Sequence, residues 1–406
     1  MSIVFLKDGA HGFHGGNNNI HLASCYGGPS SHEADRMAAI LAEARKDLGH
    51  AAFSHSAFGN GVIQKIARQE ISHVLNTDPA NITLTINTND GLQMVANGLR
   101  LTTKSKVLMY RGEYPDVQTA GSDALDNFAA STFNENMPLL VRGEKDSKDR
   151  PLGFDLAEVE SLLRSNDVKL AMVSHVQFPN GFVTDLKSLS ALCKKHDVPL
   201  VVDVAQSFGR LPIDPQELGI SAVAGPLWKW TGGSLGTGFL YTTPEFRSTL
   251  KIARLSASGL ELAAYCTDLT QGRVREDGRR FETSTLPSDA WIRTNLMLQE
   301  TNNLGVNNIA GEVAKIGALI KENLSTPRIK LFTPPGGEQD TSIIAFTLAD
   351  PYAGREKEIV DRVWSREQRV SITERLGFIR VAPHHFTSSE AALEACKAIR
   401  EAVNAL

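Results

Sequence analysis

Short apolar runs alternate with amphipathic stretches through the middle of the chain. The amphipathic stretches place apolar residues at helical spacing, as at 91–99, 156–165 and 186–196. The apolar runs predict buried strands, and they lie at 81–87, 106–110, 170–176, 199–205, 221–225 and 236–243. Apolar strands alternating with helices predict an α/β fold, in which helices cover both faces of a mostly parallel sheet.

The two ends of the chain depart from this alternation. Near the N-terminus, Ser30 and Glu33 have capping-box spacing and Gly49 follows at a helix-stop position, so we expect a helix between them. A second amphipathic stretch covers 62–75. The last third predicts a long helix over 290–324, strands at 342–348, 370–374 and 377–383, and a closing helix from about residue 388.

These patterns predict three parts of the chain. Residues 1–20 are rich in Gly, Asn and His and form an irregular N-terminal arm. The alternating pattern defines a large domain at 21–290, and the final pattern defines a smaller α+β domain at 291–406.

Composition narrows the class of protein. The chain has 406 residues and a formal net charge of −4, so it lacks the basic surplus of a nucleic-acid-binding protein. It has no apolar run of membrane-spanning length and no secretory signal, so we expect a cytoplasmic protein without a membrane partner. The histidines near the N-terminus have no acidic or cysteine companions, and we therefore predict no metal site.

Candidate chemistry follows the predicted strands. Asp203 ends an apolar strand, where ligands bind in open α/β sheets, although a strand-end cap is the simpler alternative. Lys229 stands between Trp228 and Trp230, and desolvation there would make its amine a nucleophile. The alternative is a lysine that passes an apolar patch to reach water. The Gly-rich stretch that follows precedes its strand, which argues against a dinucleotide site.

Asp203, Gln206 and Lys229 together resemble a known arrangement. An Asp-x-x-Gln strand end, followed by a lysine before a Gly-rich turn and strand, is similar to that of fold-type I enzymes dependent on pyridoxal 5′-phosphate (PLP). The nearer resemblance is to the class V aminotransferase superfamily, which includes cysteine desulfurases, kynureninase, isopenicillin-N-epimerase-like proteins and C–S lyases. The resemblance implies a seven-stranded-type sheet, a small C-terminal domain and a homodimer with shared active sites.

The resemblance assigns roles around the cofactor ring. Lys229 would hold PLP as an imine and later shuttle protons. Asp203 would pair with the pyridine nitrogen, which makes the ring an electron sink, and Gln206 would donate to the phenolic oxygen. Tyr114 falls where relatives stack an aromatic or His side chain on the ring, although it would also suit the core.

Other residues would surround the phosphate and the ring edge. Thr88 and Asn89 start a helix, as in the phosphate-binding turn of relatives, although a plain turn is the alternative. Thr285 lies in a loop similar to one that reaches the neighbouring subunit's phosphate. His175 and Gln177 belong to a segment that borders the cofactor in relatives, but His175 would equally suit a core position. Phe178 stands where many relatives have Asn.

Substrate contacts are also implied. Arg380 lies in an apolar strand at the position of the family's α-carboxylate clamp, with Arg254, Arg273 and Arg279 as the next candidates. Ser24 and Cys25 match a segment that borders the substrate pocket, although Cys25 suits a small buried thiol better.

Reaction type is left open between several chemistries. Desulfurases carry His before the lysine, where this chain has Trp228, and a nucleophilic Cys that the segment 363–380 lacks. We therefore expect an amino acid substrate and C–S bond cleavage or another β-elimination. An aminotransferase or epimerase is the enzymatic alternative, and a non-catalytic PLP-binding regulator is the alternative of another class.

Overall fold

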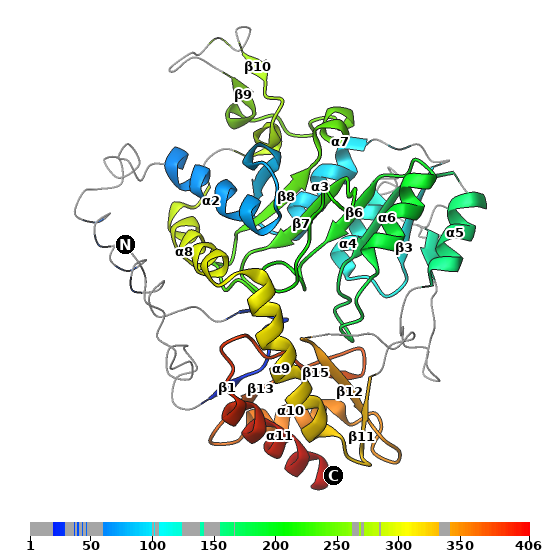
Figure 1. Cartoon of the computed structure of the whole chain (residues 1–406), viewed down its shortest axis with the longest axis vertical. Coiled ribbons are helices and arrows are strands. Elements are labelled where there is room, and N and C mark those ends of the chain that lie inside the picture. Colours follow the sequence, from blue (N-terminus) through cyan, green and yellow to red (C-terminus); the bar gives the residue numbers. More distant parts are fainter. Residues whose placement is uncertain are drawn as a thin grey trace.

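The structure is a computed structural model with a larger α/β part and a smaller α+β part, one above the other in Figure 1. It describes residues 19–28, 60–99, 101, 105–123, 139–141, 155–165, 167–261, 268, 272–283, 286–332 and 342–406, and positions 36, 39, 43 and 46. The arm at 1–18, most of the helix expected between Ser30 and Gly49, and Thr285 lie outside these residues.

The large sheet has seven strands in the described chain, in the order β2-β8-β7-β6-β5-β3-β4. Strands β7 to β4 are parallel to one another, and β8 runs against both of its neighbours. The predicted α/β class and mostly parallel sheet are confirmed. The strands span Ile82–Thr85 (β2), Lys106–Tyr110 (β3), Leu139–Val141 (β4), Val168–Ser174 (β5), Leu200–Asp203 (β6), Ala222–Pro226 (β7) and Gly238–Thr242 (β8).

Helices cover both faces of this sheet. One face packs against α2 (Asn60–Val74), α5 (Leu156–Ser165), α6 (Leu186–Lys195) and α8 (Ser288–Leu304). The other packs against α3 (Thr88–Leu99), α4 (Pro115–Asp123) and α7 (Pro244–Thr249).

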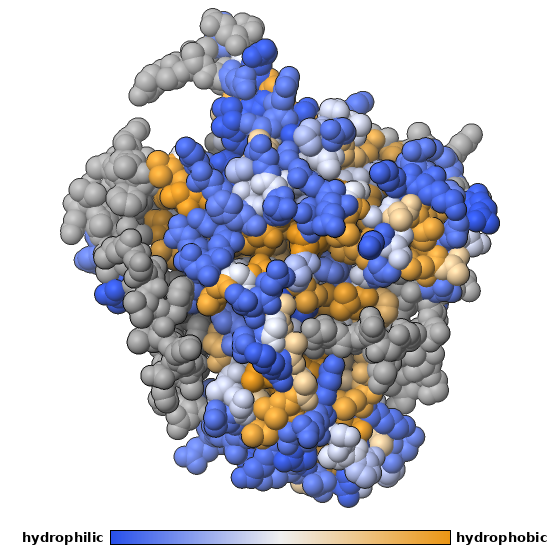
Figure 2. All heavy atoms as spheres, viewed as in Figure 1, coloured by the Kyte–Doolittle hydropathy of each residue, from blue (hydrophilic) through white to orange (hydrophobic). Residues whose placement is uncertain are grey.

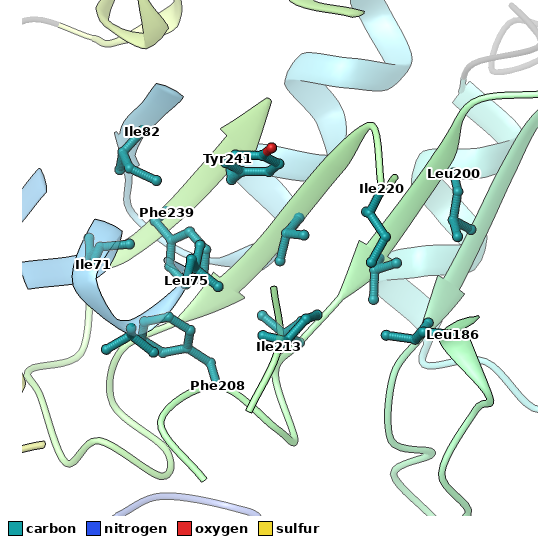
Figure 3. Close-up of a cluster of buried hydrophobic side chains, with 14 of the residues drawn as sticks. Ile71, Leu75, Ile82, Leu186, Leu200, Phe208, Ile213, Ile220, Phe239 and Tyr241 are labelled. Atoms are coloured by element: carbon teal, nitrogen blue, oxygen red, sulfur yellow. The ribbon is translucent and has the colours of Figure 1, made fainter. Parts of the chain in front are cut away.

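Successive residues of a strand serve opposite faces. In β6, Val202 packs with the cluster of α2 and α6, and Val201 packs with that of α3 and α4. Figure 3 shows part of the first cluster, in which Ile71 of α2 lies near Phe239 of β8. Because both faces are covered, these strands are apolar runs without polar alternation, as the sequence shows.

A second sheet forms the smaller part of the molecule. Its order is β11-β12-β15-β14, and all its pairs are antiparallel. The N-terminal β1 (Ile20–His21) joins this part by pairing with β13 (Val370–Ser371). The remaining elements are β11 (Ile329–Leu331), β12 (Ile344–Leu348), β14 (Thr373–Arg375), β15 (Phe378–Val381), α9 (Val306–Leu324), α10 (Glu356–Trp364) and α11 (Ser389–Asn404).

Short elements complete the part of the molecule that carries the large sheet. Strands β9 (Leu260–Glu261) and β10 (Arg273–Val274) form a small antiparallel pair. Three 3-10 turns complete the described elements, at Pro79–Asn81, Ala257–Gly259 and Gly278–Phe281. In Figure 2, polar residues cover most of the described surface, and hydrophobic residues gather mainly across the middle of the view.

The packing refines the expected division of the chain. The helix expected over 290–324 is two helices, because Gly305 has a φ of 79° and ends α8. The expected boundary at residue 290 falls within α8, whose Trp291 and Leu298 belong to the large core. Ile20 and Leu22 pack in the C-terminal core. We therefore propose that the domains meet near Gly305 and that the N-terminal strand belongs to the smaller domain.

No helix in the described part of the chain is long and apolar enough to span a bilayer. The cytoplasmic location stays a prediction.

Candidate active site

A cavity of about 810 Å³ lies where the large sheet meets the smaller domain. It is bordered by residues at the carboxyl ends of adjacent parallel strands, including Ser174 of β5, Asp203 of β6 and Pro226 of β7. Open parallel sheets bind ligands at this edge. Of the predicted site residues, the wall includes Cys25, Thr88, Tyr114, Asp203, Gln206, Lys229 and Arg380.

Lys229 follows β7 in the loop that leads to the Gly-rich turn. Its Nζ lies 5.7 Å from the centroid of the Tyr114 ring. Burial lowers the pKa of Lys229, and the nearby carboxylate of Asp203 opposes this shift. A lowered pKa favours the unprotonated amine, which is the form that acts as a nucleophile and a proton acceptor.

Asp203 places a carboxylate at the same cavity, in a buried position where its ionised form is energetically unfavourable. Its side chain ends β6, is 4% exposed, and accepts a hydrogen bond of 2.7 Å from the Ala205 N–H. Burial raises the pKa of Asp203 to about 6, against the opposing influences of this hydrogen bond and of Lys229. A cationic N–H donor placed in the cavity would stabilise the ionised carboxylate.

The N-terminal segment packs against the loop that carries Lys229. The N–H of Gly28 donates to the carbonyl of Trp228 at 2.9 Å. A Cβ on Gly28 would stand 1.7 Å from the carbonyl oxygen of Lys229, so only glycine fits there. Cys25 lines the cavity with its Sγ 3.9 Å from Thr373 Oγ1, whereas Ser24 is fully buried and does not line it.

The start of α3 faces the cavity. Thr88 lines it as the first residue of the helix, and free N–H groups at such a position suit an anion. Asn87, which the sequence analysis did not single out, also lines the cavity and accepts a hydrogen bond of 2.8 Å from the Asp90 N–H. Asn89 does not line the cavity, and its buried Oδ1 has no partner among the described residues.

Tyr114 and Phe178 form an aromatic pair at the cavity wall. Their ring centroids are 5.3 Å apart and the rings are nearly perpendicular. Tyr114 is 41% exposed, so it is not a core aromatic. Phe178 occupies the position where many relatives have Asn, and its side chain offers no hydrogen-bonding group.

His175 and Gln177 lie behind the wall and do not line the cavity. Burial lowers the pKa of His175 to about 3, so its ring is neutral. Gln177 Nε2 donates to Glu113 Oε1 at 3.0 Å. Glu113 also accepts from the Ser174 backbone N–H and hydroxyl, and burial raises the pKa of Glu113 to about 7 despite these bonds.

Glu113 was missed in the sequence analysis. It precedes Tyr114 directly and stands just after the end of β3, and a charged residue at a strand end is the signal that would have found it. Its hydrogen bonds join the segment of Tyr114 to the end of β5.

Arg380 is held in β15 by the two sides of the cavity. Its Nε donates to Thr373 Oγ1 at 3.0 Å, and Nη1 donates to the Phe178 carbonyl. The side chain is 2% exposed and lines the cavity. A guanidinium fixed in this way suits a carboxylate ligand.

Two further arginines, Arg293 and Arg375, line the cavity and were not predicted. The alternative candidates lie elsewhere in the described chain. Arg254 pairs with Asp90 at 3.0 Å, and Arg273 is 87% exposed on its side chain. Thr285 lies outside the described residues, so its role stays a prediction.

A family comparison decides what kind of protein carries this cavity. The model of the class V aminotransferases matches residues 35–362, which is most of the chain. The chain belongs to the class V aminotransferase family.

Curated relatives of this class V protein are distant. The uncharacterized aminotransferase YcbU of Bacillus subtilis is 24% identical over 326 residues, which cover 80% of each protein. A probable cysteine desulfurase of Methanothermobacter thermautotrophicus is 25% identical over 280 residues, which cover 67% of this chain and 64% of the relative.

Solved structures share the fold. The cysteine desulfurase of Thermococcus onnurineus NA1 has a TM-score of 0.80 at 17% identity, and the match covers 100% of both chains. The cystine C–S lyase C-DES, solved with its reaction product cysteine persulfide, has a TM-score of 0.79 at 20% identity, with 94% of this chain and 97% of that chain covered. The predicted PLP fold type I is therefore confirmed.

The class V protein is a PLP-dependent enzyme, a lyase or an aminotransferase. Its cavity fits the cofactor. Lys229 lines the cavity with an amine that could form a covalent link, Asp203 offers a buried carboxylate with a raised pKa, and α3 offers its N-terminus to a phosphate. Within the described residues, no group of three or more His, Cys, Asp or Glu side chains is arranged to hold a metal ion.

Proposed function

We propose that this class V enzyme cleaves a C–S bond, or carries out another β-elimination, on an amino acid. The observation that carries the proposal is that Lys229, Asp203 and Arg380 line one cavity. A buried amine, a buried carboxylate and a fixed guanidinium are what cofactor binding and α-carboxylate recognition require. A C–S lyase and probable cysteine desulfurases among the similar proteins favour sulfur chemistry.

Lys229 has two proposed tasks. Its amine holds the cofactor covalently in the resting enzyme, and the same nitrogen then takes the proton from the substrate Cα. Burial supports both tasks, because it lowers the pKa of Lys229 and so favours the unprotonated amine. When bound, the cofactor supplies an electron sink for the charge that develops at Cα.

Asp203 and Arg380 fix the two reactants. We propose that Asp203 pairs with the cationic ring nitrogen, which would offset the cost of burying its carboxylate. Arg380 would hold the α-carboxylate and so orient the Cα bonds against the ring plane. Tyr114 would stack on the ring, as the position of its side chain beside Lys229 favours.

The route of the sulfur atom separates this proposal from a desulfurase. The segment 363–380 contains Arg375 and Arg380 at the cavity but no cysteine that would take up sulfur. The sulfur-containing group would then leave as a free product. We also propose a homodimer with shared active sites, in which Thr285 reaches the phosphate of the partner subunit, as the family resemblance implies.

A product screen tests the proposed reaction. The purified holoenzyme is incubated with cystine, cysteine, S-alkylcysteines and alanine, and pyruvate, ammonia and sulfur products are measured together. Elimination predicts equal amounts of pyruvate and ammonia from a sulfur-containing substrate, and none from the Lys229→Ala variant. Amino transfer to an added keto acid without ammonia release would instead assign an aminotransferase.

A further inference from the structure

Trp230 lies directly after Lys229 but faces away from the cavity. It is 3% exposed and does not line the cavity, whereas its neighbours Trp228 and Lys229 do. Its indole Nε1–H donates to Gln206 Oε1 at 3.2 Å. Trp230 therefore touches a cavity residue from behind.

This hydrogen bond determines which way the Gln206 amide points. An indole N–H is a donor only, so the amide must turn its oxygen toward Trp230 and its NH2 group away from it. One hydrogen of that NH2 group goes to the Cys25 carbonyl, with Nε2 at 2.8 Å from the oxygen. The second hydrogen remains, on a side chain that is 4% exposed and borders the cavity.

Trp230 is itself fixed from both domains. The Arg210 guanidinium lies 4.5 Å from the centroid of the indole ring. The same guanidinium donates to the Gln206 carbonyl at 2.7 Å and to Ser342 Oγ, a residue of the smaller domain. His384 Nε2 donates to the Trp230 carbonyl at 2.6 Å. The indole and the main chain of Gln206 therefore have little freedom to rotate.

We propose that Trp230 is a positioning residue that makes Gln206 present an N–H donor, and not its carbonyl, to the phenolic oxygen of the cofactor. Without Trp230, both orientations of the amide are open, and one of them would place an oxygen against the phenolate. The proposal rests on PLP as the cofactor and on Gln206 as its neighbour, but not on the reaction type.

A donor at the phenolic oxygen has a measurable consequence in the resting enzyme. A hydrogen bond to the ionised form of a group lowers its pKa. Loss of that donor should therefore raise the pH midpoint of the cofactor's visible absorption change. The substitution Trp230→Phe keeps the aromatic ring under Arg210 but removes the N–H. We expect this variant to shift the midpoint upward by about one pH unit, since a bond to a charged group is lost in part.

A matched control and a double-mutant cycle separate positioning from packing. Trp291 is fully buried, lies away from the cavity, and its Nε1 has no partner among the described residues, so Trp291→Phe should leave the midpoint unchanged. In a Gln206→Leu background, Trp230→Phe should add no further shift, because its effect acts through the amide.

The outcomes decide whether Trp230 positions the Gln206 amide or only packs behind it. An unchanged midpoint in Trp230→Phe, or an equal shift with Leu at position 206, would overturn the proposal. If Trp230→Phe does not fold, the single variant Gln206→Leu gives the test: it removes the donor without adding a charge, so its midpoint must rise, and an unchanged midpoint contradicts us. If the enzyme catalyses no elimination but its variants show these shifts, the proposed reaction is rejected and the inference about Trp230 stands.

Discussion

At the scale of residues, the cavity is defined by charged groups that are expensive to bury. Lys229 and Asp203 have pKa values shifted by burial in opposite directions, toward their neutral forms. A ligand that supplies each group with a bonding partner would therefore reduce the free-energy cost of burying it. We propose that the cofactor is that partner, which would link its binding to the ionisation of both groups.

Arg380 tests whether the substrate is an α-amino acid. We expect Arg380→Ala to keep the yellow resting enzyme and to lose about 3 kcal/mol or more in kcat/KM, because the paired donors to the α-carboxylate disappear. Arg380→Lys keeps the charge without the planar fork and should be intermediate. Steady-state kinetics check this, with Arg273→Ala as a control at an exposed position outside the cavity. Unchanged kinetics in Arg380→Ala would move the clamp to Arg375 or Arg293.

The sequence revealed the site residues that can be recognised from their position in or just after a single predicted strand. Asp203, Lys229 and Arg380 stand out as charged residues within or after apolar runs, and all three line the cavity. Glu113 and the contact of Trp230 with Gln206 were not recognised, because the partners are distant in the chain. Ser174 is 61 residues from Glu113, and Gln206 is 24 residues from Trp230. No local pattern encodes such contacts.

At the scale of elements, strand ends and one N-terminal segment build the cavity together. The strands and helices of the large sheet follow the predicted runs, because burial on both faces leaves uninterrupted apolar segments. The segment 25–28 was expected only to border the substrate pocket. It also packs its backbone against the loop of Lys229, through Gly28. In the sequence, such backbone packing is indicated by nothing more than a glycine.

Gly28 and Gly27 offer a matched pair of substitutions for this packing. A Cβ on Gly28 would meet the Lys229 carbonyl oxygen at 1.7 Å, whereas a Cβ on Gly27 meets nothing within 4 Å. We expect Gly28→Ala to destabilise the protein by about 2 kcal/mol or more and to weaken cofactor retention, because backbone must move. Gly27→Ala should stay within about 0.5 kcal/mol of wild type. Urea unfolding and cofactor content after gel filtration measure both; equal behaviour of the two variants would refute this packing role.

At the scale of the whole molecule, the site lies between two separate cores. The large core holds the strands that end in Ser174 and Asp203, and the smaller core supports Arg380 in β15. The N-terminal strand β1 pairs within the smaller part before the chain reaches the cavity at Cys25. The alternating pattern predicted the large sheet and the α+β pattern predicted the smaller one. Neither predicted that β1 pairs within the smaller part, because β1 is too short to show periodicity.

The most direct test of the account is to locate the covalent link to the cofactor. Borohydride reduction of the holoenzyme, followed by peptide mapping, should find PLP on the single peptide that contains Lys229, and Lys229→Ala should carry none. Modification of any other lysine, or protein without PLP, would contradict the central claim that Lys229 in this cavity holds the cofactor.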